Sequence, residues 1–259
     1  MTAIYSEFKD KVALVSGAAN GIGRATAIAF ARNGARVVVC DINEAGGNET
    51  VALISAAGGA ALFKYCDVSV DRYNREVVAF ATQEFGGVDY AFNDVGYTSP
   101  KIPLAETGEA LVDCMLDTNV KGLWSAMRHQ IPAMLLRGGG AIVNNASTLA
   151  FVALAGRAVY SASKAGVVAM TRAAAVEYAA RNVRVNVLCP GTTETGELRP
   201  LLQQYSGHPE KIESIRAQQP INRWAQPCEQ AEPVLFLCSD SASYVIGAAL
   251  MVDGGYTIR

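Results

Sequence analysis

Histidine is scarce in this sequence, and its cysteines are scattered. Only His129 and His208 occur among 259 residues, and neither lies near a cysteine or an aspartate cluster, so we expect no metal site. No Cys-x-x-Cys pair is present, and a chain of this length needs no disulfide framework. We therefore expect the six cysteines to be small buried hydrophobic residues, at positions 40, 66, 114, 189, 228 and 238.

Long apolar runs, runs of one charge and a leader sequence are also missing. No uncharged apolar stretch approaches the roughly 18 residues of a membrane span. Charged residues interrupt the N-terminus before a signal peptide could form, at Glu7, Lys9, Asp10 and Lys11. The net charge is −2, and lysine and arginine do not cluster. These absences predict a cytoplasmic protein with neither a nucleic-acid nor a membrane partner.

Short apolar segments alternate regularly with helical patterns along a chain that is 51% hydrophobic. Several strand segments are apolar throughout, as in parallel strands that helices cover on both faces. The pattern predicts an α/β fold, a doubly wound parallel sheet of about seven strands with helices on both faces, in one domain over 1–259. We expect strands at 12–15, 37–40, 61–66, 90–92, 141–143, 183–189 and 249–252, and helices at 25–33, 43–57, 71–85, 111–136, 159–180 and 229–238.

One stretch, 191–222, breaks this alternation. Pro200, Pro209 and Pro220 interrupt it, and it follows the sixth strand segment. Doubly wound sheets bind ligands beyond the carboxyl ends of their strands. We expect an irregular, substrate-binding insertion there.

A glycine-rich turn, Ser16-Gly17-Ala18-Ala19-Asn20-Gly21-Ile22-Gly23, joins the first strand segment to the first helix. Glycines at such a turn let backbone N–H groups approach a phosphate closely. The spacing is Gly-x-x-x-Gly-x-Gly rather than the usual Gly-x-Gly-x-x-Gly, and a plain tight turn remains an alternative. Its place between strand and helix favours a dinucleotide site in a Rossmann-type fold.

Asp41 follows the second strand segment, about 20 residues beyond the turn, where a ribose-binding carboxylate is expected. It would repel a 2′-phosphate, and no basic residue stands at Asn20 or at Ile42 to pair with one. The pattern favours NAD over NADP. A carboxylate that merely caps the next helix is the alternative.

The strongest local signal is Tyr160-Ser161-Ala162-Ser163-Lys164. Tyr160 and Lys164 are four residues apart in a helical segment and project from the same face. A cation at about 4 Å contributes roughly 4 kcal/mol at an effective dielectric near 20, enough to lower the pKa of a phenol towards neutral. The pair predicts a tyrosine that exchanges protons, although such spacing also arises by chance.

Together these motifs resemble the short-chain dehydrogenase/reductase family over essentially the whole chain. Each motif is modest alone, but all occur in the order and at the intervals of the family. They are Gly17-x-x-x-Gly21-Ile22-Gly23, Asp67-Val68, Asn119-Val120-Lys121-Gly122, Ser147, Tyr160 with Lys164, and Pro190-Gly191.

The resemblance implies a role at each matching position. Ser147 corresponds to the serine that binds the substrate oxygen, Tyr160 to the proton donor and acceptor, and Lys164 to the lysine that binds the nicotinamide ribose. Asn119 resembles an asparagine that interrupts a helix and holds a water in a proton relay. The implied cofactor-binding residues are Gly17, Asn20, Gly21, Ile22, Gly23, Asp41, Ile42, Asp67, Val68, Asn93, Val95, Gly96, Tyr160, Lys164, Pro190, Gly191, Thr193 and Thr195.

Three positions depart from the family pattern. Ser16 replaces the usual threonine and keeps its hydroxyl. Asp94 stands where the family has asparagine, which we expect to affect local packing or stability more than chemistry. Thr193 occupies a position usually held by isoleucine or valine.

The sequence thus predicts an NAD-dependent oxidoreductase that interconverts a secondary alcohol, or a cyclic diol, and a ketone. A non-catalytic NAD-binding regulator on the same fold is the alternative, whereas an epimerase with an added domain would need a longer chain. The apolar segment 148–154, beside 97–99 and the insertion, predicts a small uncharged substrate. The resemblance also implies a homotetramer.

Overall fold

Seven parallel strands form one sheet in a computed structural model that describes residues 5–259. The spatial order is β3-β2-β1-β4-β5-β6-β7, so the order reverses between β1 and β4. This confirms the predicted doubly wound sheet. The strands are β1 (Val12–Ser16), β2 (Arg36–Asp41), β3 (Ala60–Tyr65), β4 (Tyr90–Asn93), β5 (Gly140–Asn145), β6 (Val183–Pro190) and β7 (Ala249–Val252).

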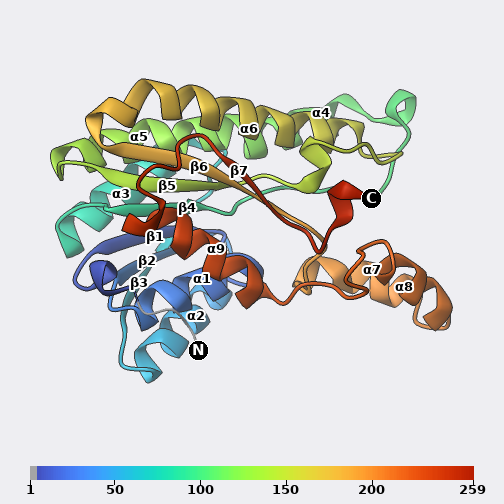
Figure 1. The fold of residues 1–259 in the computed structure, drawn as a ribbon, viewed down its shortest axis with the longest axis horizontal. Coiled ribbons are helices and arrows are strands. Elements are labelled where there is room, and N and C mark those ends of the chain that lie inside the picture. The colour runs from blue at the N-terminus through green and yellow to red at the C-terminus, as the bar shows by residue number, and fades with distance from the viewer. Residues whose placement is uncertain (1–4) are drawn as a thin grey trace.

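Helices cover both faces of the sheet (Figure 1). One face packs against α1 (Gly21–Arg32), α2 (Glu44–Ala56) and α9 (Pro227–Cys238). The other face packs against α3 (Asp71–Phe85), α5 (Gly122–Leu136) and α6 (Ala158–Tyr178), with α4 (Glu109–Leu116) contacting α6. Among residues 5–259, no helix has both the length and the apolar character of a membrane span.

The apolar strand segments are explained by burial on both faces. Neighbouring residues on one strand enter different cores: Leu14 and Val38 pack with α3 and α5, whereas Val15 and Val39 pack with α1 and α9. Because side chains alternate across a strand, a sheet that is covered twice needs an apolar residue at every position.

The helical region predicted over 111–136 is not continuous. A π-helical turn, Asp117–Lys121, separates α4 from α5. Hydrophobic periodicity does not reveal this widened turn, because the buried side chain that marks it, Asn119, bonds to other segments of the chain. The first helix also begins at Gly21 rather than at 25, so that it includes the end of the glycine turn.

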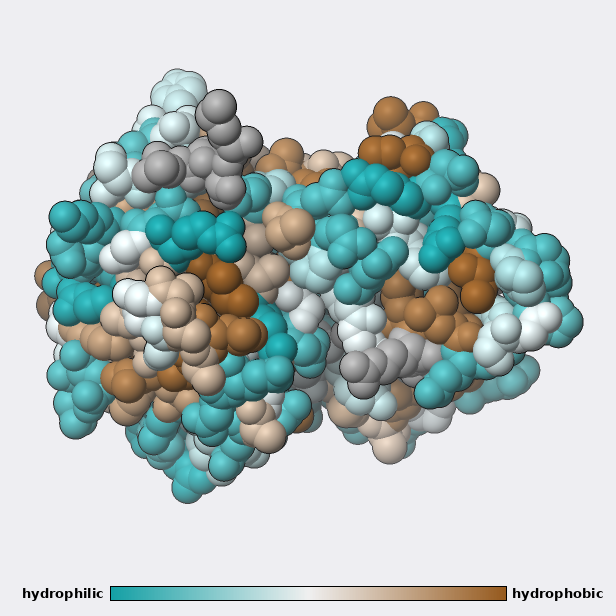
Figure 2. Space-filling model, turned by 90° about the horizontal axis from the view of Figure 1, so that it is seen from below, coloured by the Kyte–Doolittle hydropathy of each residue, from teal (hydrophilic) through white to brown (hydrophobic). Residues whose placement is uncertain are grey.

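The stretch 191–222, whose sequence breaks the regular alternation, contains two short helices. They are α7 (Arg199–Gln204) and α8 (Pro209–Arg216), which project from one end of the sheet (Figure 1). Pro209 begins α8, a position at which its missing N–H is not needed. Figure 2 shows apolar surface on this projecting part as well as on the body.

Candidate active site

A cleft of about 620 Å³ lies over the carboxyl ends of the strands. This volume is within the range of small-molecule and cofactor sites, about 300–1,000 Å³. Most of the predicted residues line it: Gly17, Asn20, Gly21, Ile22, Asp41, Ile42, Asp67, Val68, Val95, Gly96, Ser147, Tyr160, Lys164, Pro190, Gly191, Thr193 and Thr195. The fold therefore brings together residues from the carboxyl ends of six strands, β1 to β6, and from α1 and α6.

The glycine turn is built by close backbone contacts. Gly17 has φ +69°, a left-handed conformation that favours glycine. A Cβ on Gly23 would lie 2.3 Å from the carbonyl oxygen of Gly17, so α1 can press against the turn only without a side chain there. The side chain of Asn20 does not cap α1. The first N–H groups of this helix and its dipole therefore offer an anion site at the cleft.

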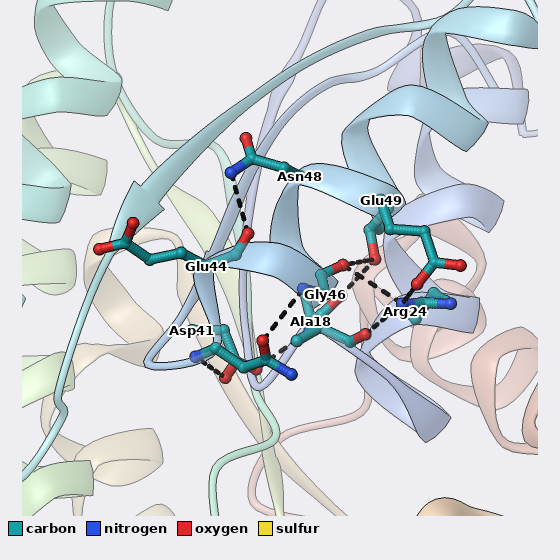
Figure 3. A network of polar contacts seen from close by, with 10 residues as sticks. Ala18, Arg24, Asp41, Glu44, Gly46, Asn48 and Glu49 are labelled. Atoms are coloured by element: carbon teal, nitrogen blue, oxygen red, sulfur yellow. Dashed lines mark hydrogen bonds and ion pairs between the residues drawn. The ribbon is translucent and has the colours of Figure 1, made fainter.

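Asp41 fixes the far side of this turn (Figure 3). Its Oδ2 accepts a hydrogen bond from the N–H of Ala19 at 3.0 Å, and its Oδ1 accepts one from the N–H of Asn43 at 2.9 Å. The cap of α2 is Asn43, whose Oδ1 accepts from the N–H of Gly46. Asp41 is therefore not the helix cap that the sequence left as an alternative, and it lines the cleft.

Arg24 is the cation beside this turn. One of its terminal nitrogens lies 2.5 Å from the carbonyl oxygen of Ala19 and 2.6 Å from the carboxylate of Glu49 (Figure 3). The guanidinium is thus held by the carbonyl oxygen of Ala19 and by the carboxylate of Glu49. These contacts leave it poorly placed to bind a phosphate group of a ligand in the cleft.

Tyr160 and Lys164 lie one turn apart near the start of α6. The Lys164 side chain is only 3% exposed, and its Nζ donates to the backbone carbonyl of Asn145 at 2.9 Å. The same Nζ lies 5.8 Å from the centre of the Tyr160 ring. The ammonium group is thus held at the end of β5, beside the phenol.

Ser147 follows β5 in an extended conformation. Its Oγ accepts a hydrogen bond from the N–H of Leu149 at 3.1 Å, which begins a short 3-10 turn. The backbone therefore fixes the position of the hydroxyl, and its O–H can donate towards the cleft.

Three of the predicted residues lie behind the cleft rather than on its wall. Asn119, in the π-helical turn, pairs with both the N–H and the carbonyl of Tyr97, at 2.6 and 3.0 Å, and donates to Ser163. Asn93 exchanges hydrogen bonds with Gln130 and donates one to Asn144 inside the sheet. Gly23 provides the close contact described above. The geometry thus gives all three a supporting position.

The two segments expected beside the substrate, 97–99 and 191–222, contribute Tyr97, Thr98, Thr192 and Leu198 to the wall. The segment 148–154 does not line this cleft, and Phe151 is 46% exposed. Other lining residues were missed, and among them Asn145 carried a usable signal, since it is a polar residue at the end of an apolar strand. The lining residues not assigned to the cofactor or to catalysis are Cys66, Ser69, Asp94, Tyr97, Thr98, Cys114, Thr118, Asn145, Ala146, Thr192 and Leu198.

Burial raises the pKa of Cys189, next to Pro190, to about 12, so this thiol is neutral at physiological pH. Within 5–259, no three histidine, cysteine, aspartate or glutamate residues are placed to share a metal ion. The cleft is suited to an elongated, anionic ligand. The phenol of Tyr160, which could exchange a proton with such a ligand, stands at one end of the cleft.

Comparisons with known proteins agree over nearly the whole chain. Residues 17–257 match the family model described as enoyl-(acyl carrier protein) reductase. Cis-4-hydroxycyclohexanecarboxylate dehydrogenase of Sinomonas cyclohexanicum is 41% identical, covering 96% of this chain and 98% of its own. Cyclohexanol dehydrogenase of an Acinetobacter species is 37% identical, covering 98% of each chain. A structure from Beutenbergia cavernae, described as an NAD(P)-dependent gluconate 5-dehydrogenase with NADP bound at low occupancy, has a TM-score of 0.89 at 35% identity, covering 97% and 98%.

The contact at Gly23 generates a prediction. We expect Gly23→Ala to weaken dinucleotide binding by more than about 100-fold, or to destabilise the fold, because the new Cβ meets backbone at 2.3 Å. Calorimetric titration with NAD measures the binding affinity, and thermal unfolding measures the stability of the fold. The matched control is Gly108→Ala, where an added Cβ has no neighbour within 4 Å. Unchanged NAD affinity and stability in Gly23→Ala would contradict the packing argument.

Proposed function

This chain belongs to the short-chain dehydrogenase/reductase family and is an oxidoreductase of CH–OH groups, and from that premise we propose that it uses NAD to interconvert a cyclic secondary alcohol and its ketone. The single observation that carries this proposal is the cleft in which Tyr160 and the buried Lys164 stand at one end and the uncapped glycine turn in the middle. The relatives supply the substrate class, since two of them are named for cyclic alcohols.

The residues on the cleft wall suit a dinucleotide. The turn from Gly17 to Ile22 would hold the pyrophosphate, Asp41 the adenosine ribose, and Lys164 the nicotinamide ribose. Residues at the end of β6, beside Tyr160 in the lining of the cleft, would hold the nicotinamide. When bound, this cofactor gives or takes the hydride at the substrate carbon.

The chain's own residues handle the proton and the oxygen. Tyr160 accepts the proton of the alcohol during oxidation and returns it during reduction. Ser147 donates a hydrogen bond to the same oxygen as its charge changes. Lys164 stabilises the phenolate through its buried positive charge. Asn119 fixes the backbone of Tyr97 and bonds Ser163 of α6, and so supports the loop that follows β4.

An enzyme fits these residues better than a non-catalytic regulator. A regulator would need only the cofactor half of the cleft, whereas Ser147, Tyr160 and Lys164 all meet at its other end. The relatives are named as dehydrogenases, which supports the same choice.

The mechanism predicts different results for two substitutions. Tyr160→Phe should lower kcat at least 10²–10⁴-fold, the usual range for general acid–base catalysis, while NAD affinity stays nearly unchanged. Lys164→Ala should lose activity and weaken NAD binding together, because Lys164 both binds the ribose and acts on the phenol. The oxidation rate of the wild type should rise with pH, since the phenolate accepts the proton.

Steady-state kinetics with cyclohexanol and NAD, and calorimetric NAD titration of each variant, check this prediction. Near wild-type turnover by Tyr160→Phe would overturn the proposed mechanism. If both substitutions change NAD affinity equally, Lys164 does not make the ribose contact that is assigned to it.

The preference for NAD over NADP is part of the proposal. The family includes a structure with NADP bound, so membership alone does not choose between the two cofactors. Asp41 supports NAD, because a carboxylate repels a 2′-phosphate, and the nearby Arg24 is engaged by Glu49. We expect Asp41→Ser to narrow the ratio of kcat/KM between NAD and NADP by at least about tenfold. Equal kcat/KM values for both cofactors in the wild type would contradict the assignment.

A homotetramer is also proposed. Large apolar side chains remain exposed on the outer helices, among them Leu136, 91% exposed on α5, and Val176, 82% exposed on α6. Apolar surface of this kind is typical of subunit contacts. Light scattering at micromolar concentration should give four times the monomer mass of 27.3 kDa, and a monomer would contradict the proposal.

A cytoplasmic location belongs to the same proposal. All six cysteines are unpaired, and four of them are buried. Free thiols persist most readily in a reducing compartment, which supports this location.

A further inference from the structure

The charges that line the cleft are unevenly distributed. Its wall carries the carboxylates of Asp41, Asp67 and Asp94 and the ammonium of Lys164. Asp41 ends β2 and Asp67 follows β3, on the side proposed to hold adenosine. Asp94 follows β4, which lies beyond the glycine turn in the sheet order and beside β5. This third carboxylate therefore stands on the nicotinamide side of the turn.

One oxygen of the Asp94 carboxylate accepts a hydrogen bond, and the other lies beside the first turn of α1. Its Oδ1 accepts a hydrogen bond from the amide nitrogen of Asn145 at 2.5 Å. Its Oδ2 lies 3.0 Å from the place that a Cβ on Gly23 would take, at the first turn of α1. The negative charge is thus fixed between the end of β5 and the positive end of a helix.

The same loop packs against Lys164. The ammonium donates to the backbone carbonyl of Asn145, the residue whose side chain bonds Asp94. Gly96, two residues after Asp94, has no room for a Cβ, which would lie 2.8 Å from the Lys164 Nζ. Asp94 is therefore two hydrogen-bonded steps from the ammonium that stands beside Tyr160.

We propose that Asp94 determines specificity for the oxidation state of the cofactor, favouring the oxidised form over the reduced form. This inference rests on the proposed NAD-dependent function. The two forms share the same adenosine, riboses and phosphates, and differ by one positive charge on the nicotinamide ring. A fixed carboxylate on that side attracts the cationic ring of NAD⁺ and gives NADH no such gain, whereas its repulsion of the pyrophosphate weakens both forms equally.

The ratio of the two dissociation constants isolates this effect. Asp94→Asn removes the charge but keeps an oxygen that can accept from Asn145. It can also offer an amide to the buried Oδ1 of Asn145, which has no partner in the described part of the chain. We expect the ratio Kd(NADH)/Kd(NAD⁺) to fall about fivefold, as for a charge roughly 10 Å away at moderate effective dielectric. NADH binding is followed by fluorescence titration and NAD⁺ binding by calorimetry.

A matched substitution and a second neutral variant complete the test. Asp67→Asn removes a carboxylate from the same cleft at the end of β3, and should leave the ratio unchanged. Asp94→Ser lacks the amide of Asn, so a fall in the ratio in both neutral variants assigns the effect to charge rather than to packing.

The outcomes separate this inference from the proposed function. If the wild type binds neither NAD⁺ nor NADH, the proposed function fails. If the wild type binds both and neither Asp94 variant changes the ratio, or if Asp67→Asn changes it equally, Asp94 does not select the oxidation state and only this inference is overturned.

Discussion

Burial of a parallel sheet on both faces is the constraint from which the other features of this protein follow. Helices occupy each face, so loops can meet solvent and ligands only where the strands begin or end. All seven strands run the same way, and residues from the carboxyl ends of six of them therefore share one cleft. The reversal of strand order between β1 and β4 separates the loops at that edge and leaves room for a ligand.

The cleft combines a rigid backbone with a buried charge. The turn at Gly17 and Gly23 approaches so closely that it excludes side chains, which exposes helix N–H groups to an anion. Lys164 is almost fully buried, and desolvation of its ammonium is offset by the carbonyl of Asn145. Asn145 also binds Asp94, so one residue at the end of β5 connects Lys164 with the carboxylate that lies beside the glycine turn.

The two halves of the cleft are specified differently. Its proposed cofactor half consists of strand ends and backbone contacts, which tolerate little variation. Its proposed substrate half adjoins the insertion that carries α7 and α8, with Leu198 on the wall. Loops placed on a rigid scaffold can change without disturbing the sheet. This division explains how relatives of similar fold are named for different alcohols, and why cofactor chemistry is easier to infer here than the substrate.

The sequence by itself determined the sheet, the glycine turn and the Tyr160–Lys164 pair. Their signals are local: fully apolar strand segments, glycine spacing and a four-residue interval on a helix. Tertiary structure alone decided that Asn93 and Asn119 lie behind the cleft, that Phe151 lies off it, and that a π-helical turn interrupts 111–136. It also decided that Asp94 reaches Asn145. These features depend on contacts between residues far apart in the chain, because the partner of a polar side chain is set by packing rather than by its neighbours in sequence.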